Sequence, residues 1–300
     1  FKALQIGNVW RADRPQKGRF RQFMQCDIDI LGEPGNLAEI ELILATTAML
    51  GKLSFQNFTV CINDRNILKA MAAYSGFAEE SYDQVFIILD KMDKIGLDGV
   101  AAELEESGFA KESIEKYIDL FDKISDGIDG VLYCKEKLEG FLAPEIADNM
   151  TTIIESVLEA KTANFDPTLV RGMSYYTGPI FEISIDGFAG SVGGGGRYDE
   201  MIGKFTGTPT PATGFSIGFE RIVMLLMEKG FKVPGSADKK AYLLDKKLSS
   251  AKLVEVVKKA GEERKAGKNI NIVYMKKNKK FQKEQLLSEG YEIIEEIYND

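Results

Sequence analysis

The chain has 300 residues, of which 44% are hydrophobic and 28% charged, and its formal net charge is −8. This length allows one large core and two or three domains. The acidic balance argues against a generally basic nucleic-acid-binding coat, although residues 238–300, with 15 Lys and Arg against 11 Asp and Glu, could contact a polyanion locally. No apolar run is long enough to span a bilayer, and no signal-peptide pattern is present.

The chain contains no histidine, which excludes Ser-His-Asp and Cys-His catalysis and histidine-based metal sites. The segment GFSIG (214–218) matches the nucleophile elbow of hydrolases, but without a histidine base we do not expect a hydrolytic Ser216. Cys26, Cys61 and Cys134 are widely separated and show no metal or redox spacing. They indicate a reducing cytoplasm, and we predict no metal site.

The first elements alternate between strands and helices. Two antiparallel strands are predicted over 2–11 and 20–31, around a loop that contains Pro15 and Gly18. Because the chain begins at Phe1 within a predicted strand, we expect a further segment upstream. A helix over 39–53 and a buried strand over 58–64 follow, and residues 64–164 have almost wholly helical periodicity.

Strands return in the second half of the chain, at TLVRG (168–172) and GPIFEISID (178–186). The run GGGGRYDE (193–200) has too many glycines for a packed strand, which favours either a backbone that a ligand approaches closely or a flexible loop. A strand then leads into a helix that ends at Gly230. Alternating strands and helices over 240–298 predict a small sheet of parallel character.

Alternation along residues 20–30 separates two faces. The even-numbered side chains are mostly apolar and are expected to pack on helices, whereas the odd-numbered side chains carry a cation, an aromatic ring, an amide and two carboxylates. These odd-numbered residues are Arg21, Phe23, Gln25, Asp27 and Asp29. A solvated sheet face with cross-strand ion pairs is the alternative to a binding site.

Two further segments add cations and aromatic rings. RGMSYYTG (171–178) places an arginine before two tyrosines, although a strand edge with packed tyrosines would look the same. GFER (218–221) places Arg221 in the first turn of a helix, where an anion is favoured, although an ordinary surface arginine is equally compatible. Arginines from several segments and no acid–base pair together suit phosphate chemistry that proceeds by positioning and charge neutralisation.

Three segments carry a family resemblance. QIGNVWRADRPQKGRFRQFMQCDIDI (5–30) resembles motif 2 of class II aminoacyl-tRNA synthetases in its histidyl-tRNA synthetase form. LVRGMSYYTG (169–178) is similar to that family's signature segment, and GGGRYDEMIGKF with PATGFSIGFERI (194–222) is similar to motif 3. The resemblance covers residues 1 to about 230 and two of the three class II motifs.

The resemblance implies a role for each matching residue. Arg11 and Arg171 would act on the α-phosphate and the substrate carboxylate as the catalytic cations, and Tyr175 and Tyr176 would line the histidine pocket. The implied ATP-binding residues are Arg11, Arg19, Arg21, Phe23 and Arg221. The implied histidine-binding residues are Arg11, Gln25, Asp29, Arg171, Tyr175, Tyr176, Gly194 and Gly195.

The resemblance also implies an α+β fold with a class II antiparallel sheet flanked by helices. The expected domains are a catalytic core of two parts (1–75 and 163–232), a helical insertion (76–162) and a partial anticodon-binding α/β domain (238–300). The family's homodimer contact and amino-group-binding loop precede motif 2 and are not in this sequence.

The implied activity is that of a ligase that joins L-histidine to ATP and transfers the histidyl group to tRNA(His). ATP with Mg²⁺ would be a substrate, and we expect no tightly bound organic cofactor, a homodimer in the full-length protein, and no membrane. A non-catalytic relative, acting as a regulatory subunit of histidine biosynthesis or as a tRNA sensor, is the alternative. The lysines of KKNKKFQK (276–283) could contact RNA phosphates or form a solvated helix face.

Overall fold

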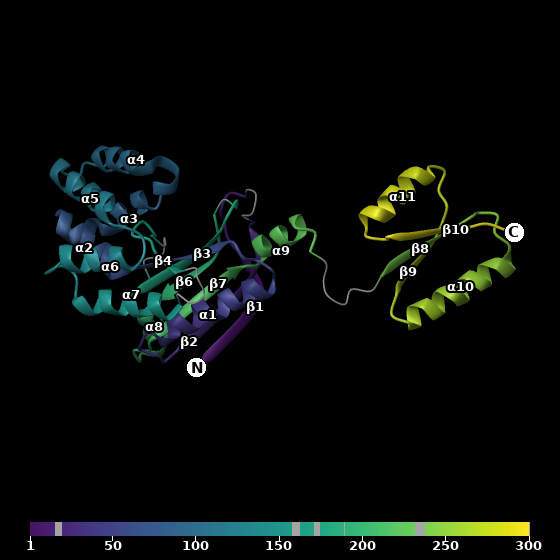
Figure 1. Cartoon of the computed structure of the whole chain (residues 1–300), viewed down its shortest axis with the longest axis horizontal. Helices are drawn as coiled ribbons and strands as arrows, with labels where there is room; N and C mark the ends of the chain where they lie inside the picture. Colours follow the sequence, from purple (N-terminus) through teal and green to yellow (C-terminus); the bar gives the residue numbers. More distant parts are fainter. Residues whose placement is uncertain (16–19, 158–162, 171–174, 189, 232–237, 300) are drawn as a thin grey trace. The chain divides into compact units, whose positions relative to one another are not determined.

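The computed structural model describes residues 1–299, apart from 16–19, 158–162, 171–174, 189 and 232–237. These residues form two compact units, Phe1–Leu226 and Met227–Asp300. The first unit is built on a mixed sheet and the second on a small parallel sheet (Figure 1). The domain boundaries suggested by the sequence stay predictions. None of the described helices is long and apolar enough to cross a membrane.

The first unit contains a seven-stranded sheet in the order β1-β2-β7-β6-β5-β3-β4. All neighbouring strands are antiparallel except β3 and β4. This confirms the predicted class II type of antiparallel sheet with flanking helices. The strands are β1 (Lys2–Trp10), β2 (Gln22–Leu31), β3 (Phe58–Asp64), β4 (Ala163–Phe165), β5 (Pro179–Ile185), β6 (Ser191–Arg197) and β7 (Ala212–Gly218).

Helices follow β2, β3, β6 and β7 along the chain. Two of them, α1 (Leu37–Lys52) and α7 (Pro144–Val157), pack on each other and on strands of the sheet. The described part of residues 76–162 forms helices before it reaches β4, in line with the predicted helical character. The other helices are α2 (Arg65–Ser75), η1 (Glu79–Ser81), α3 (Tyr82–Leu89), α4 (Met92–Glu106), α5 (Lys111–Lys123), α6 (Ile128–Lys137), α8 (Asp199–Thr206) and α9 (Phe219–Glu228).

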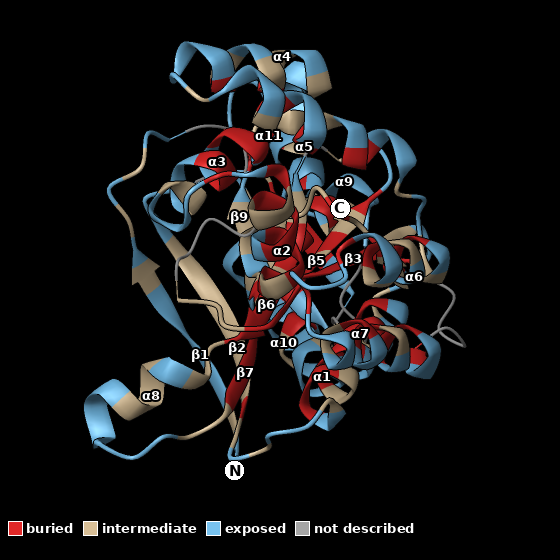
Figure 2. Ribbon diagram, turned by 90° about the vertical axis from the view of Figure 1, so that its left-hand side faces the viewer, coloured by how far each residue is buried: buried red, intermediate tan, exposed pale blue. Residues whose placement is uncertain are grey.

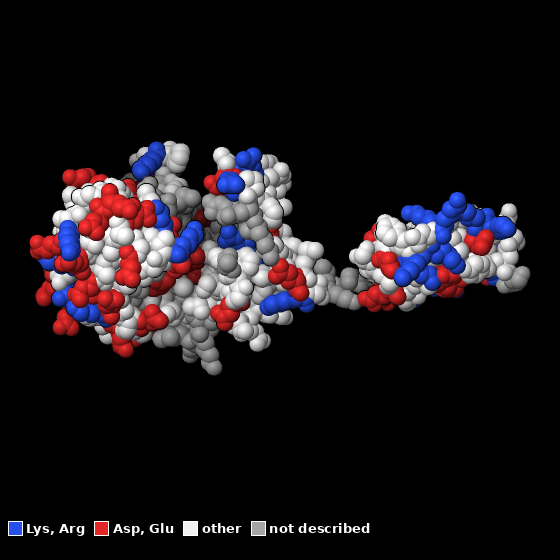
Figure 3. All heavy atoms as spheres, turned by 90° about the horizontal axis from the view of Figure 1, so that it is seen from above, with Lys and Arg blue, Asp and Glu red and all other residues white. Residues whose placement is uncertain are grey.

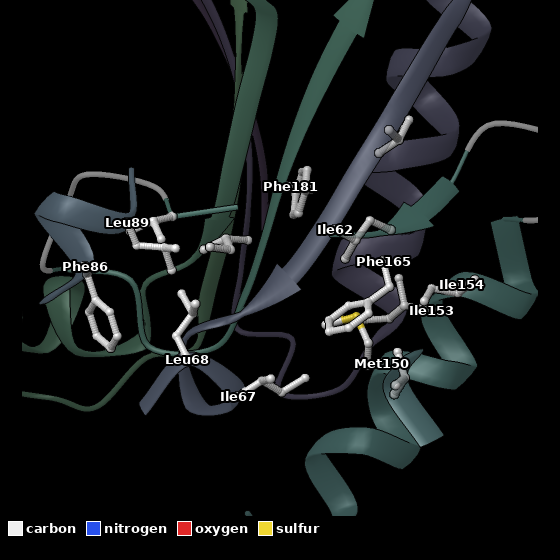
Figure 4. Packing of buried hydrophobic residues seen from close by; sticks show 14 of the residues in the cluster. Ile62, Ile67, Leu68, Phe86, Leu89, Met150, Ile153, Ile154, Phe165 and Phe181 are labelled. Carbon is white, nitrogen blue, oxygen red and sulfur yellow. The ribbon is translucent and has the colours of Figure 1, made fainter. Parts of the chain in front are cut away.

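One hydrophobic core joins the sheet to these helices. Ile62 of β3, Phe165 of β4 and Phe181 of β5 are fully buried, and they share this core with Met150 and Ile153 of α7 (Figure 4). Strands β5 and β6 are mostly buried, whereas edge strand β1 is mostly exposed (Figure 2). These core residues therefore lie under β5, β3 and β4, toward the end of the sheet that is opposite β1.

The prediction of a strand at TLVRG (168–172) is wrong for the residues that the structure describes, because Thr168–Val170 belong to no strand. The Asp166 carboxylate accepts hydrogen bonds from the Thr168 backbone N–H at 2.9 Å and from its hydroxyl at 2.6 Å. The backbone of Leu169 also donates to the carbonyl of Asp166 at 3.1 Å. This local turn replaces ladder hydrogen bonds, and the strand forms earlier, at β4.

The second unit has a three-stranded parallel sheet in the order β10-β8-β9, which confirms the predicted pattern. Its elements are β8 (Lys239–Leu244), α10 (Ser250–Lys265), β9 (Asn269–Tyr274), α11 (Lys279–Ser288) and β10 (Ile293–Ile297). Lysines gather on one face of this unit (Figure 3). Two of them, Lys279 and Lys283, bind Glu296 at 3.1 and 2.5 Å, whereas Lys276, Lys277 and Lys280 are exposed. Contact of these lysines with RNA stays a prediction.

Asp64 closes the N-terminus of α2 at the end of β3. Its Oδ1 accepts hydrogen bonds from the backbone N–H of Asn66 at 2.7 Å and from the side-chain amide at 2.9 Å. The same amide of Asn66 donates to the carbonyl of Thr177 at 3.2 Å. Burial raises the pKa of the Asp64 carboxyl to about 6, and the two Asn66 bonds only partly oppose this. The cap thus joins α2 to the segment that carries the paired tyrosines.

We predict that Asp64→Asn removes a pH dependence of stability. The folded pKa lies above the unfolded value of about 4. The stabilising contribution of protonated Asp64 is therefore complete below pH 4 and is lost as pH rises through 6. Asn keeps the cap oxygen, so wild type should lose roughly 2–3 kcal/mol relative to Asp64→Asn between pH 4 and pH 7. Urea unfolding at several pH values measures this. Exposed Asp186→Asn is the control and should follow wild type, and a constant difference for Asp64→Asn would contradict the prediction.

Candidate active site

Strand β2 presents its odd-numbered side chains to one face of the sheet, next to strands of small residues. Gln25 lies opposite Gly218, Asp27 opposite Ser216, and Asp29 opposite Gly214 on β7. These cross-strand pairs form rows of residues that continue onto β6, where Ser216 pairs with Gly194 and Gly214 pairs with Gly196. Because paired residues share a face, these rows form one floor, and Ser216 lies within β7 rather than at a strand–helix turn. Predicted site residues from three segments are therefore brought to one surface.

Aromatic side chains meet Asp29 at one end of this floor. The Tyr198 hydroxyl donates a hydrogen bond to Oδ1 of Asp29. The Tyr198 ring meets Tyr175 edge-on with centroids 6.2 Å apart, and Tyr175 lies 4.5 Å from the ring of Tyr176. A Cβ on Gly196 would come within 2.9 Å of the Tyr176 ring, so Tyr176 rests on the floor itself. We call Asp29, Tyr175, Tyr176 and Tyr198 the tyrosine end of the site.

The carboxyl group at this end is perturbed by its surroundings. Burial raises the pKa of Asp29, the Tyr198 hydrogen bond opposes that rise, and the negative charge of Asp27 adds to it. Burial and the Asp29 hydrogen bond also raise the pKa of Tyr198, so its hydroxyl keeps its proton at neutral pH. The pair is thus fixed with the phenol as donor and the carboxylate as acceptor. The Tyr198 hydroxyl thereby fixes the orientation of the Asp29 carboxylate.

Cations and an aromatic ring gather at the other end of β2. The Arg11 guanidinium lies over the Phe23 ring, 4.1 Å from its centroid, which is a cation–π contact. Arg11 Nε donates to the carbonyl of Phe20 at 2.8 Å, and Arg21 Nε donates to the carbonyl of Asp13 at 3.3 Å. Backbone carbonyls therefore hold two arginines near the start of the strand, and Arg11 Nε also lies 3.7 Å from Oδ2 of Asp13.

The start of α9 is bound to the same strand. Oε1 of Glu220 accepts the Met24 backbone N–H at 2.7 Å, and the guanidinium of Arg221 donates to the Ser191 carbonyl on β6. A Cβ on Gly218 would lie 3.5 Å from Cδ of Arg221, so Arg221 lies close to the end of β7. Met24 lies between Phe23 and Gln25, and Glu220 therefore fixes the first turn of α9 beside the arginine-bearing end of β2. We call Arg11, Arg21, Phe23 and Arg221 the arginine end.

The glycine run forms strand β6 in the middle of the sheet, which corrects the expectation of a non-strand segment. Close approach of neighbouring groups explains why glycine occupies this strand. A Cβ on Gly195 would lie 1.9 Å from the Gly214 carbonyl oxygen, and one on Gly193 would lie 2.8 Å from the Phe215 ring. Gly195 faces the side opposite the row that contains Gly194, so the two glycines predicted to line the pocket lie on opposite faces.

A buried ion pair supports the floor from behind. Arg197, at the end of β6, binds Glu39 of α1 in two places, with Nε–Oε1 at 2.7 Å and Nη2–Oε2 at 2.8 Å. Glu39 is fully buried and also accepts the Thr213 hydroxyl at 3.2 Å. The Arg197 carbonyl accepts the Thr177 N–H at 2.8 Å, directly after the paired tyrosines. One residue thus connects α1, β6 and the tyrosine segment.

The structure places most of the predicted site residues at one of the two ends. Gln25 lies between the ends on β2. Arg19 and Arg171 lie outside the described residues, and their roles stay predictions. Sequence reasoning missed Tyr198, Arg197, Glu39 and Glu220. Tyr198 could have been found by strand parity, because it follows Gly196 at a spacing of two. Glu39 could have been found because it shares the helix face of Leu42 and Ile43, where a charge needs a partner.

Comparison with known proteins identifies similar sequences. A family model described as histidyl-tRNA synthetase matches residues 2–222. The chain is 48% identical over 235 residues to a histidine–tRNA ligase of Leifsonia xyli, an alignment that covers 75% of this chain and 54% of that protein. It is 38% identical over 242 residues to one of Korarchaeum cryptofilum, covering 77% and 53%. The chain thus spans about half the length of the curated relatives it matches.

Solved structures share the fold. A histidyl-tRNA synthetase from Nostoc sp. PCC 7120 is 26% identical with a TM-score of 0.74, covering 98% of this chain and 69% of that one. A Bacillus halodurans protein described as an ATP phosphoribosyltransferase regulatory subunit/histidyl-tRNA synthetase has a TM-score of 0.70 at 20% identity. At that identity the likeness shows the fold alone.

We predict that Glu39→Ala destabilises the first unit strongly. Removing Glu39 takes away the two-point partner of the buried Arg197 guanidinium and leaves it only the more exposed Asp199 at 3.2 Å, which costs up to about 3–5 kcal/mol. Urea unfolding followed by circular dichroism measures the loss. The matched control on the same helix is Glu41→Ala, whose ion pair with Lys2 is exposed and whose loss should stay below about 1 kcal/mol. Similar losses for the two variants would show that the Arg197–Glu39 pair does not support the fold.

Proposed function

Because this chain belongs to the histidyl-tRNA synthetase family, we propose that it carries the site that activates L-histidine with ATP and transfers the histidyl group to tRNA(His). The observation that supports this most is the two-ended face of β2. Carboxylate and phenol groups gather at one end and guanidinium groups at the other. A small amino acid and a nucleoside triphosphate would therefore lie along one strand, with their reacting groups between the two ends.

The tyrosine end would hold the imidazole ring. Asp29 would accept a ring N–H and Tyr176 would contact the other ring nitrogen, with Tyr175 lining the pocket beside it. Tyr198 supports this role because its hydroxyl fixes the orientation of the Asp29 carboxylate. A pocket that hydrogen-bonds both ring nitrogens rejects apolar side chains of the same shape, because its buried polar groups would be left unpaired.

The arginine end would hold ATP, taken up with Mg²⁺ as a substrate. Arg221 and Phe23 would enclose the adenine ring, while Arg19 and Arg21 would bind the outer phosphates. Arg11 lies over Phe23 in this structure, so its guanidinium would move onto the α-phosphate as the adenine takes its place on the ring. Arginines suit this role because their planar fork grips phosphate oxygens in two places and keeps its charge.

The first step needs no protein base. A carboxylate oxygen of histidine forms a bond to the α-phosphorus of ATP, and the bond from that phosphorus to pyrophosphate breaks. Arg11 and Arg171 would neutralise the charge that develops on the phosphoryl oxygens. In the second step a ribose hydroxyl of the tRNA terminus attacks the acyl carbon, and AMP leaves. A chain without histidine can therefore perform this chemistry.

The remaining properties follow from the same proposal. The longer protein would form a homodimer and act in the cytoplasm, where the three free cysteines would stay reduced. Residues 238–300 would contribute to tRNA binding through their exposed lysines. A non-catalytic regulatory relative would be expected to lack part of the arginine or tyrosine set, whereas Arg11, Tyr175, Tyr176 and Arg221 are present here at the two ends of one surface.

We predict that Arg11→Ala lowers histidine-dependent ATP–pyrophosphate exchange about 100–1,000-fold, because one hydrogen-bond donor to the charge that develops on the phosphoryl oxygens is lost. Histidine affinity, measured by calorimetry, should fall less than the exchange rate. Lys69→Ala is the control, because it removes one exposed cation on α2. No exchange and no histidine binding by wild type would contradict the proposed function, and unchanged exchange in Arg11→Ala would contradict the role of Arg11.

A further inference from the structure

Strand β7 is shorter than its neighbour β2, and it ends beside the arginine end of the site. The two strands pair as far as Gln25 and Gly218, and α9 begins directly after that pair. Residues 22–24 of β2 therefore have a paired strand on one side only, which is β1. Phe23 lies in this half-paired stretch, so its position depends on the group that takes the place of β7.

A side chain from the first turn of α9 takes this place. Glu220 lies two residues beyond the last paired residue of β7, and its Oε1 accepts the backbone N–H of Met24 at 2.7 Å. Its Oε2 is buried and has no hydrogen-bond partner among the residues that the structure describes. Glu220 therefore holds β2 through one oxygen, and an amide oxygen in the same position could accept the same N–H.

The hydrogen bond between Glu220 and Met24 joins the segments that carry the two groups proposed to enclose the adenine ring. Phe23 directly precedes Met24 on β2, and Arg221 directly follows Glu220 on α9. The Arg221 guanidinium also donates to the Ser191 carbonyl on β6. The position of the ring on β2 relative to the guanidinium on α9 is therefore constrained by the Glu220 bond.

A flat base that binds between two planar groups depends on their separation. Dispersion contacts act only at short range, so such groups have to be held within about 0.5 Å of the required geometry. A phosphate chain is less demanding, because the attraction between opposite charges falls slowly with distance. Loss of the Glu220 bond should therefore affect recognition of the base more than recognition of the phosphates.

We propose that Glu220 is a positioning residue for the nucleotide base, because its bond to Met24 fixes Phe23 relative to Arg221 and so shapes the slot for a purine ring. This inference rests on the proposed function, since it takes ATP as the ligand of the arginine end. Glu220 acts through the backbone of β2 and not through contact with the reacting groups. Its acceptor oxygen carries the role, so Glu220→Gln should retain it and Glu220→Ala should lose it.

The test is calorimetric titration of the 300-residue chain and its variants with three ligands in the presence of Mg²⁺. ATP carries the base and the phosphates, inorganic tripolyphosphate carries the phosphates alone, and L-histidine is the proposed ligand of the tyrosine end. We expect Glu220→Ala to weaken ATP binding about 10-fold, since one hydrogen bond that positions the base is lost. Its affinities for tripolyphosphate and L-histidine should not change, and Glu220→Gln should keep the ATP affinity of wild type.

The matched control is Glu200→Ala, because Glu200 is also the second residue of its helix, α8, but is exposed. This variant should bind all three ligands like wild type. Amide hydrogen exchange adds a structural readout of the Glu220 bond. The Met24 N–H should lose protection in Glu220→Ala, whereas the N–H of Ile28, which pairs with Phe215 on β7, should keep it.

Unchanged ATP affinity in Glu220→Ala would overturn the inference. Equal losses for ATP and tripolyphosphate would also overturn it, because Glu220 would then support the fold or the phosphate contacts and not the base. A loss in Glu220→Gln as large as that in Glu220→Ala would do the same. If wild type binds ATP and L-histidine and only the Glu220 variants depart from this pattern, the proposed function stands without this inference. If wild type binds neither ligand, both are overturned.

Discussion

The paired contact between Arg197 and Glu39 is the constraint on which the rest of the site depends. It joins the helix behind the sheet to the central glycine strand, and the same arginine donates to the carbonyls of Glu33 at 3.1 Å and Gly35 at 2.8 Å. Through its own carbonyl it also holds the chain just after the paired tyrosines. Because Glu39 is wholly enclosed, its carboxylate has no water as an alternative partner. The position of the tyrosine end relative to β2 therefore follows from a contact on the opposite side of the sheet.

Because side chains alternate along a strand, neighbouring residues face opposite sides of the sheet and make different contacts. Arg197 points toward α1, and Tyr198, one residue later, points toward Asp29. On β2 the same alternation places Cys26 and Ile28 against the core and Asp27 and Asp29 on the opposite face of the sheet. From Phe23 to Asp29 the strand rises about 20 Å, at about 3.3 Å per residue. That length separates a region that attracts anions from one that accepts ring donors, and a substrate that bridges them has its reacting atoms in the middle.

Much of this arrangement could be predicted from local sequence patterns, and the part that could not depends on contacts between distant segments. The polar face of β2 followed from alternation alone, and the βαβαβ order of the second unit followed from periodicity. The glycine run was misinterpreted because the cost of glycine in a strand is local, whereas the benefit at Gly193 and Gly195 comes from Phe215 and Gly214 on another strand. Likewise, no pattern within residues 20–30 distinguishes Asp27 from Asp29. The difference arises only from Tyr198, which β6 brings to one of them.

The glycine composition of β6 limits how this surface can change over evolution. Where the floor consists of main chain, no side chain is available there to be exchanged for a larger or smaller one. Adding even a methyl group at Gly195 or Gly196 would push a neighbouring strand or the Tyr176 ring aside. A new ligand preference would therefore have to arise at the rims, on β2 and in the tyrosine segment, while the centre stays invariant. Divergent relatives could then share the same backbone platform and still recognise different small molecules.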